Sequence, residues 1–212
     1  TWECKWDVDL CLNGKTITGA DEAAVITVES NMSLNITDCR ETGTICHAAD
    51  ATSGCGIDVQ GTLTLWNGAI TGNPEKGVQV TGTFYMNGGS IAGNADRGVY
   101  VRTNGKFTMS DGTITGNAKG GVYVAAGSKF TMTGGSITGN NTASGGGGVY
   151  VSTSSTPAGT FTVSGKVQIT DNWKNGTLEN GIYVQGDSST RDNVFLSQRT
   201  AYPNNIVTYI NI

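Results

Sequence analysis

The sequence predicts an all-β protein: a single right-handed parallel β-helix, a solenoid with three short strands per coil and capped ends. Three observations predict this fold. Glycine is abundant, with 32 residues, while only 14% of the chain is charged. Threonine and asparagine are also frequent, and all three residue types disfavour long helices. Short segments in which apolar and polar residues alternate recur at nearly constant spacing, as expected for stacked strands.

A glycine followed by an apolar–x–apolar strand marks each repeat. It occurs at Gly56, Gly77, Gly98, Gly121, Gly148 and Gly181. The successive spacings are 21, 21, 23, 27 and 33 residues. A propeller blade needs about 40 residues, and a leucine-rich repeat needs a leucine ladder that this chain lacks. The spacing therefore favours β-helix coils of 21–23 residues, each pairing in parallel with the next.

Two further strands complete each repeat. The second carries paired apolar residues: Leu63 and Leu65, Phe84 and Met86, Phe107 and Met109, Phe130 and Met132, Phe161 and Val163. The third is centred on Ile70, Ile91, Ile114, Ile137 and Ile169, and it ends in a turn at Asn73, Asn94, Asn117, Asn140 and Asn172. Because side chains alternate along a strand, we expect the apolar columns to stack inside. We expect the turn asparagines to form a ladder between coils.

We expect residues 1–212 to form one domain. Its parts are a cysteine-bearing N-terminal cap with degenerate coils (1–55), regular coils (56–187) and a C-terminal cap (188–212). Trp2 and Trp6 are expected to cover the open N-terminal end, because bare terminal coils expose strand edges. Loop insertions follow residue 140, at 141–147, 152–159 and 173–180. Protruding loops on a rigid scaffold often carry function.

Five cysteines lie within the first 55 residues: Cys4, Cys11, Cys39, Cys46 and Cys55. They show no C-x-x-C spacing, and the single histidine, His47, is a poor basis for a zinc site. Their confinement to one end favours at least one disulfide in an oxidising compartment. Buried free thiols are the alternative, and the sequence leaves the pairing open.

Charge and motifs argue against several classes of function. The net charge of −4 disfavours a nucleic acid or an anionic membrane as partner. No apolar run approaches the roughly 20 residues that span a bilayer. The glycine run 145–148 lacks the Lys-Ser/Thr end of a phosphate loop, and calcium-binding nonapeptides are absent. We expect no cofactor and no metal ion.

Several phrases resemble those of a known group of proteins. The segments Leu10–Ile17 (LCLNGKTI) and Leu34–Cys39 (LNITDC), and the coils from Gly98 to Asn140, are similar to repeat regions of large surface proteins of Gram-positive gut bacteria. The resemblance covers nearly the whole chain, but its motifs specify architecture only and carry no catalytic residues. It implies an extracellular or cell-surface location and a place within a longer, adhesin-like protein.

The outward positions of the first strand form an aromatic column. Tyr100, Tyr123, Tyr150 and Tyr183 each hold the middle of a GVYV or GIYV segment. Such a strip suits sugar rings or a protein partner. Cross-strand stacking that stabilises the sheet is the structural alternative.

A catalytic site is harder to find. Glu75 and Asp96 occupy equivalent positions in successive coils, but Lys76 and Arg97 follow them, which favours solvated ion pairs. We therefore assign no catalytic residue. The leading hypothesis is a surface or secreted module that acts as a rigid spacer or as an adhesin for a host or plant glycan or a surface protein. A carbohydrate-active enzyme, either a polysaccharide lyase or a glycoside hydrolase, is the alternative.

Overall fold

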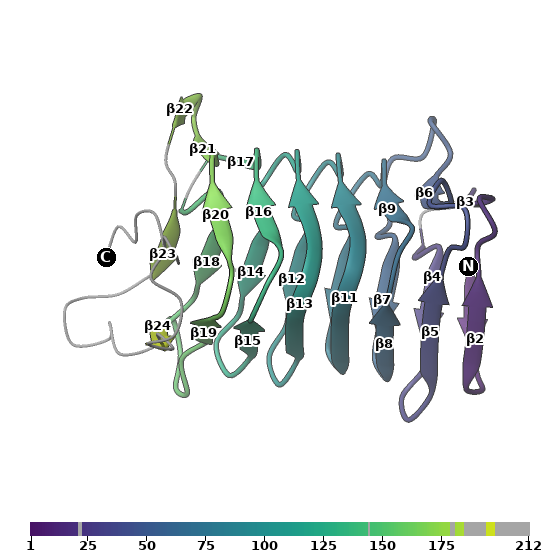
Figure 1. Cartoon of the computed structure of the whole chain (residues 1–212), viewed down its shortest axis with the longest axis horizontal. Coiled ribbons are helices and arrows are strands. Elements are labelled where there is room, and N and C mark those ends of the chain that lie inside the picture. Colours follow the sequence, from purple (N-terminus) through teal and green to yellow (C-terminus); the bar gives the residue numbers. More distant parts are fainter. Residues whose placement is uncertain (21–22, 144, 179–180, 185–193, 198–212) are drawn as a thin grey trace.

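The computed structural model describes residues 1–20, 23–143, 145–178, 181–184 and 194–197. These residues wind into an elongated stack of coils, with the N-terminus at one end and successive coils following along the long axis (Figure 1). The elements of the described part are all strands, and no helix there could cross a membrane. The predicted all-β parallel solenoid is confirmed.

One face of the stack is an eight-stranded parallel sheet to which each coil contributes one strand. In spatial order the strands are β1 (Trp2–Cys4), β4 (Ile26–Val28), β7 (Ile57–Val59), β10 (Val78–Val80), β12 (Val99–Val101), β14 (Val122–Val124), β18 (Val149–Val151) and β23 (Ile182–Val184). Spatial order follows chain order, so the sheet is built by stacking one coil on the next. The last six are the predicted G-apolar-x-apolar strands.

The second and third strands of each coil form the other faces. The second-strand ladder runs through β2 (Val8–Cys11), β5 (Ser33–Thr37), β8 (Thr62–Leu65), β11 (Thr83–Ala92), β13 (Lys106–Thr115), β15 (Lys129–Met132), β19 (Thr160–Ser164) and β24 (Val194–Ser197). Separate third strands are β3 (Thr16–Gly19), β6 (Thr44–His47), β9 (Ala69–Thr71), β16 (Ser136–Thr138) and β20 (Gln168–Thr170). In β11 and β13 the second and third strands are continuous, which the sequence did not predict. The β11–β13 register shifts near Asn87, as at a β-bulge, so the chain bends without leaving the ladder.

The core consists of the predicted apolar columns. Phe84, Phe107, Phe130 and Phe161 are almost fully buried and stack in register. Successive ring centroids are 4.9, 4.6 and 4.6 Å apart, with interplanar angles of 8–12°. This spacing matches the separation of about 4.8 Å between neighbouring strands, so the backbone ladder itself sets the aromatic stack.

The turn asparagines form the predicted ladder, and they do so inside the protein. Each side-chain Nδ2 donates to the Oδ1 of the next asparagine at 2.8–3.0 Å, along Asn73, Asn94, Asn117, Asn140 and Asn172. The backbone N–H of each of the first four also donates to that same oxygen at 3.1 Å. All five are buried, and buried amides are tolerated because these bonds satisfy them. His47 ends the ladder, with its Nδ1 2.8 Å from the Oδ1 of Asn73.

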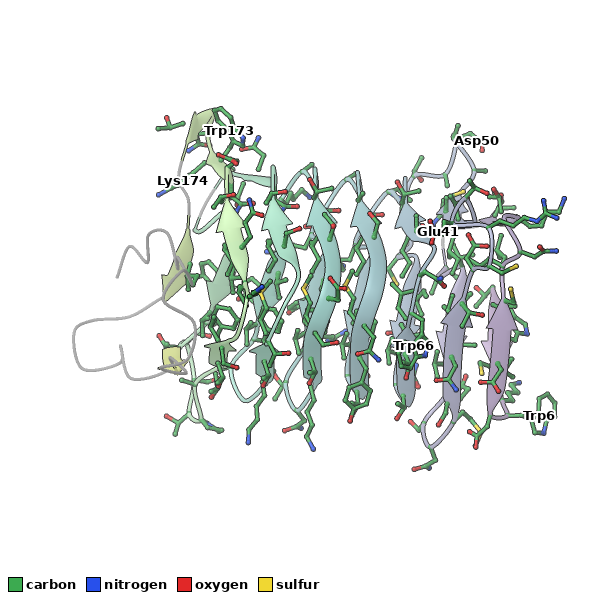
Figure 2. The ribbon with its side chains drawn as sticks, viewed as in Figure 1. Trp6, Glu41, Asp50, Trp66, Trp173 and Lys174 are labelled. Carbon is green, nitrogen blue, oxygen red and sulfur yellow. The ribbon has the colours of Figure 1, made fainter. Side chains whose placement is uncertain are left out.

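The first 55 residues are more regular than the sequence indicated. They provide β1 to β6, two full coils: the first pairs in register with the second, and the second pairs with β7, β8 and β9. Trp6 is 74% exposed and points away from the stack at the N-terminal end, so it does not cover the core as expected (Figure 2). Trp2 lies in β1 and is 39% exposed. Most of the predicted C-terminal cap, 188–212, lies outside the described residues.

Two of the segments expected as insertions after residue 140 pair with each other. Asn141–Thr142 (β17) pairs in parallel with Trp173–Lys174 (β21), which pairs antiparallel with Thr177–Leu178 (β22). This small sheet stands at one side of the later coils (Figure 1). Strand pairing therefore anchors the segment that leads into 145–147.

Candidate functional site

The tyrosine column lies on the eight-stranded sheet, as predicted. Tyr100 pairs with Tyr123, Tyr123 with Tyr150, and Tyr150 with Tyr183 in the strand register. Tyr100, Tyr123 and Tyr150 each stand between two buried valines of their strand, so the alternation of the strand turns them outward. The side chains of Tyr100, Tyr123 and Tyr150 are half-buried. For Tyr183 the structure describes only the backbone position.

The three described rings differ in how they meet. Tyr123 and Tyr150 stack face to face, with centroids 4.8 Å apart and an interplanar angle of 8°. Tyr100 and Tyr123 meet edge to face, with centroids 5.2 Å apart and an angle of 77°. The column is therefore not a uniform flat strip. The Tyr123–Tyr150 pair is a stack of two parallel rings, and Tyr100 meets one end of that stack edge to face.

The guanidinium of Arg97 lies over two of these rings. The Cζ of Arg97 lies 4.6 Å from the ring centroid of Tyr123 and 5.6 Å from that of Tyr100. Lys76 reaches Tyr100 at 6.0 Å. Arg97 also holds the carboxylate of Asp96 at 3.3 Å, which fixes the guanidinium beside the rings. Cation–π contacts of this kind contribute about 0.5–1 kcal/mol each at exposed sites.

A hollow of about 340 Å³ opens beside the paired rings. Its lining residues are Arg97, Lys119, Gly120, Val122, Tyr123, Thr142, Gly145, Gly146 and Tyr150. They come from three successive coils and from the insertion after residue 140. This volume is at the small end of the range for ligand pockets, about 300–1,000 Å³, so the hollow suits a small ligand.

The insertion rests directly on the tyrosine column. Gly145 has a φ of +85°, and a Cβ built on it would lie 2.2 Å from a ring carbon of Tyr150. Only glycine accepts both this backbone conformation and this contact. Close packing against the ring thus explains the first glycine of the run 145–148, which superficially resembles a phosphate loop.

The charged residues that line the hollow are both basic, and one of them, Arg97, is paired with the carboxylate of Asp96. Two of its lining residues, Arg97 and Lys119, are cations, and none is a carboxylate. Lys119 is exposed and forms no ion pair with any residue that the structure describes. Sequence reasoning assigned Arg97 to an ion pair only and did not consider Lys119. The sequence feature that could have identified both cations is a basic residue three or four positions before the outward tyrosine, as in Arg97–Tyr100 and Lys119–Tyr123.

The carboxylates considered for catalysis are paired locally. Glu75 and Asp96 do occupy equivalent places, since the N–H of Asp96 donates to the carbonyl of Glu75 at 3.0 Å. Each binds the cation that follows it, with Glu75–Lys76 at 3.2 Å and Asp96–Arg97 at 3.3 Å. These contacts match the ion pairs predicted from the sequence.

The cysteines carry no disulfide in this structure. Cys4 and Cys55 are buried, Cys46 is partly buried, and Cys11 and Cys39 are exposed. Within the described residues no group of three or more His, Cys, Asp or Glu side chains could hold a metal ion.

The coil geometry and the surface site define a parallel β-helix with an aromatic, basic hollow on one sheet. A protein-family model described as "Right handed beta helix region" matches residues 24–207. The chain therefore belongs to this family, and its coils are right-handed. Searches of curated proteins and of solved structures gave no match.

Proposed function

We propose that this protein is a cell-surface or secreted β-helix module that binds a glycan in the hollow beside Tyr123 and Tyr150. The observation that carries the proposal is the parallel pair of half-buried tyrosine rings at the edge of an open hollow. Sugar rings present apolar C–H faces and polar rims, and such ligands suit an aromatic surface bordered by a few polar groups.

The two cations favour a glycan with a negative group. Arg97 offers a planar guanidinium already fixed by Asp96, and Lys119 offers an ammonium that makes no ion pair with a described residue. A carboxylate or sulfate on the sugar would complete this charge arrangement. A rigid stack of coils holds the site at a fixed distance from either end of the module, which fits an adhesin-like role in a longer protein.

The test is binding of the purified chain to an array of neutral, carboxylated and sulfated glycans, followed by titration of the strongest ligand. Tyr123→Ala and Tyr150→Ala should each weaken binding about tenfold, because a ring contact contributes about 0.5–1.5 kcal/mol beyond its buried area. Lys119→Gln should weaken binding of acidic glycans only, and less so at high salt.

Tyr85→Ala is the matched control, because Tyr85 is 42% exposed on β11, away from the hollow. It should leave binding unchanged. Full binding by the Tyr123→Ala, Tyr150→Ala double variant would overturn the proposal. Release of shortened sugar products during the titration would instead support the carbohydrate-active alternative, with Glu75→Gln and Asp96→Asn as the variants to assay.

A further inference from the structure

Two exposed thiols meet at the N-terminal end of the stack. Cys11 is the last residue of β2, and Cys39 lies two residues beyond the end of β5, the strand that pairs with β2. Their Sγ atoms are 3.6 Å apart. A disulfide needs about 2.05 Å, a gap that exposed side chains can close by rotation. Among the described residues this is the one thiol–thiol contact, since Cys46 has Thr18 Oγ1 as its neighbour, at 4.0 Å.

The two turns that carry these thiols are fixed to each other by a buried carboxylate. Asp38 is fully buried, and its two oxygens accept hydrogen bonds from the N–H of Gly14 at 2.6 Å and of Gly43 at 2.5 Å. Arg40 donates from Nε to the Oδ1 of Asn13 at 3.0 Å. The folded chain therefore presents both sulfurs to each other before any bond forms.

We propose that Cys11 and Cys39 form a disulfide that joins the first coil to the second. The oxidant is a small disulfide such as oxidised glutathione. The Cys11 thiolate attacks one glutathione sulfur, forming a mixed disulfide and releasing one glutathione thiolate. Cys39 then loses its proton and attacks the Cys11 sulfur, which releases the second glutathione. Two protein thiols are oxidised and one glutathione disulfide is reduced to two thiols.

The surroundings assign the roles of the two sulfurs. Hydrogen bonds with the backbones of Cys39 and Asn13, and the contact with the Cys39 side chain, lower the pKa of Cys11. The hydrogen bond to Cys11, together with desolvation, raises the pKa of Cys39. Cys11 is thus the attacking thiolate and Cys39 the resolving thiol. By contrast, burial raises the pKa of Cys55 to about 12, which keeps it protonated at neutral pH.

The bond would stabilise the end of the stack that has the fewest neighbours. β2 is a terminal strand of its sheet path, with β5 as its pairing partner there. The two cysteines are 28 positions apart, so the bond would close a long loop in the opened state. Loop-closure entropy of this size lowers the equilibrium constant for opening of the first coil by a factor on the order of 100. This inference does not depend on glycan binding.

The experiment uses the full chain with all five cysteines, equilibrated in a buffer of reduced and oxidised glutathione. The expected result is an intact mass about 2 Da below that of the reduced protein, three titratable thiols after denaturation, and one cross-linked peptide pair containing Cys11 and Cys39. Amide exchange in β1 and β2 should slow on the order of 100-fold on oxidation. Cys11→Ser and Cys39→Ser should each abolish the mass change.

Cys46→Ser is the matched control, because Cys46 is partly exposed on the same coils but lies beside a threonine. It should keep the disulfide. Five titratable thiols after equilibration, a cross-link between any other pair, or a disulfide between two chains would overturn the proposal. Circular dichroism of each serine variant establishes that the fold is intact.

Discussion

The protein contains two aromatic columns with nearly the same ring spacing and different consequences. The inner column of phenylalanines stacks at 4.6–4.9 Å, and the outer column of tyrosines at 4.8–5.2 Å. Both spacings follow from parallel strand pairing, so stacking by itself does not distinguish a core from a binding surface. The phenylalanines are enclosed by the coil, whereas the tyrosines are half-exposed beside a basic hollow. Burial therefore separates the structural column from the candidate functional one.

The largest expected effect is on the inner column. Phe107→Ala removes a ring stacked between Phe84 and Phe130 and leaves a cavity that rigid coils cannot fill. We expect the free energy of unfolding to fall by about 3–5 kcal/mol. Urea unfolding monitored by circular dichroism measures it, with the half-exposed neighbour Thr108→Ala as control. A loss below 1 kcal/mol would show that the column is not the main source of stability.

An intermediate effect is expected at the buried asparagine ladder. Asn117→Ala removes the Oδ1 that accepts from both the backbone N–H and the Nδ2 of Asn94. Because these donors are buried, we expect a loss of about 2–3 kcal/mol in the free energy of unfolding. The outward-facing Thr115→Ala is the comparison variant in the same urea experiment. Equal stability of the two variants would contradict a structural role for the ladder.

The smallest effect on stability is expected in the outer column. Tyr123→Ala loses two cross-strand ring contacts and one cation–π contact, together about 1 kcal/mol. The same variant should weaken glycan binding about tenfold. Substitution in the outer column is therefore expected to affect binding more than stability, whereas substitution in the inner column mainly lowers stability. A stability loss as large as that of Phe107→Ala would place the tyrosines in the structural framework instead.

The repeat pattern predicted most of the fold because each strand is written in a short segment of sequence that recurs from coil to coil. A two-residue alternation fixes which side chains point inward, and a spacing near 22 residues fixes which of them stack. The first two coils were predicted as degenerate versions of the same plan, because they lack the Gly-Val-Tyr-Val phrase. The second coil nevertheless places Ile26 and Val28, and Leu34 and Ile36, in register with the apolar columns of the third. Strand pairing accepts any apolar residues in register, so a coil can be regular without the exact motif.

The candidate site was predicted only in part. The sequence placed Tyr100, Tyr123 and Tyr150 on one outward column, and it marked the later insertions as candidate binding loops. It did not place Lys119 beside them, because that neighbourhood arises when three coils and an insertion meet. The β17–β21 pairing joins segments about thirty positions apart, and no local pattern encodes it.

The sequence by itself determined the solenoid, its inward columns, its asparagine ladder and the outward tyrosines, because all of these repeat with the coil. Only the tertiary structure decided what surrounds those columns. It enclosed the phenylalanines, placed Arg97 over Tyr123, and set Gly145 against Tyr150. It also brought Cys11 to Cys39. These contacts join residues that share no motif, and they depend on which coils become neighbours in the stack and on the register between them.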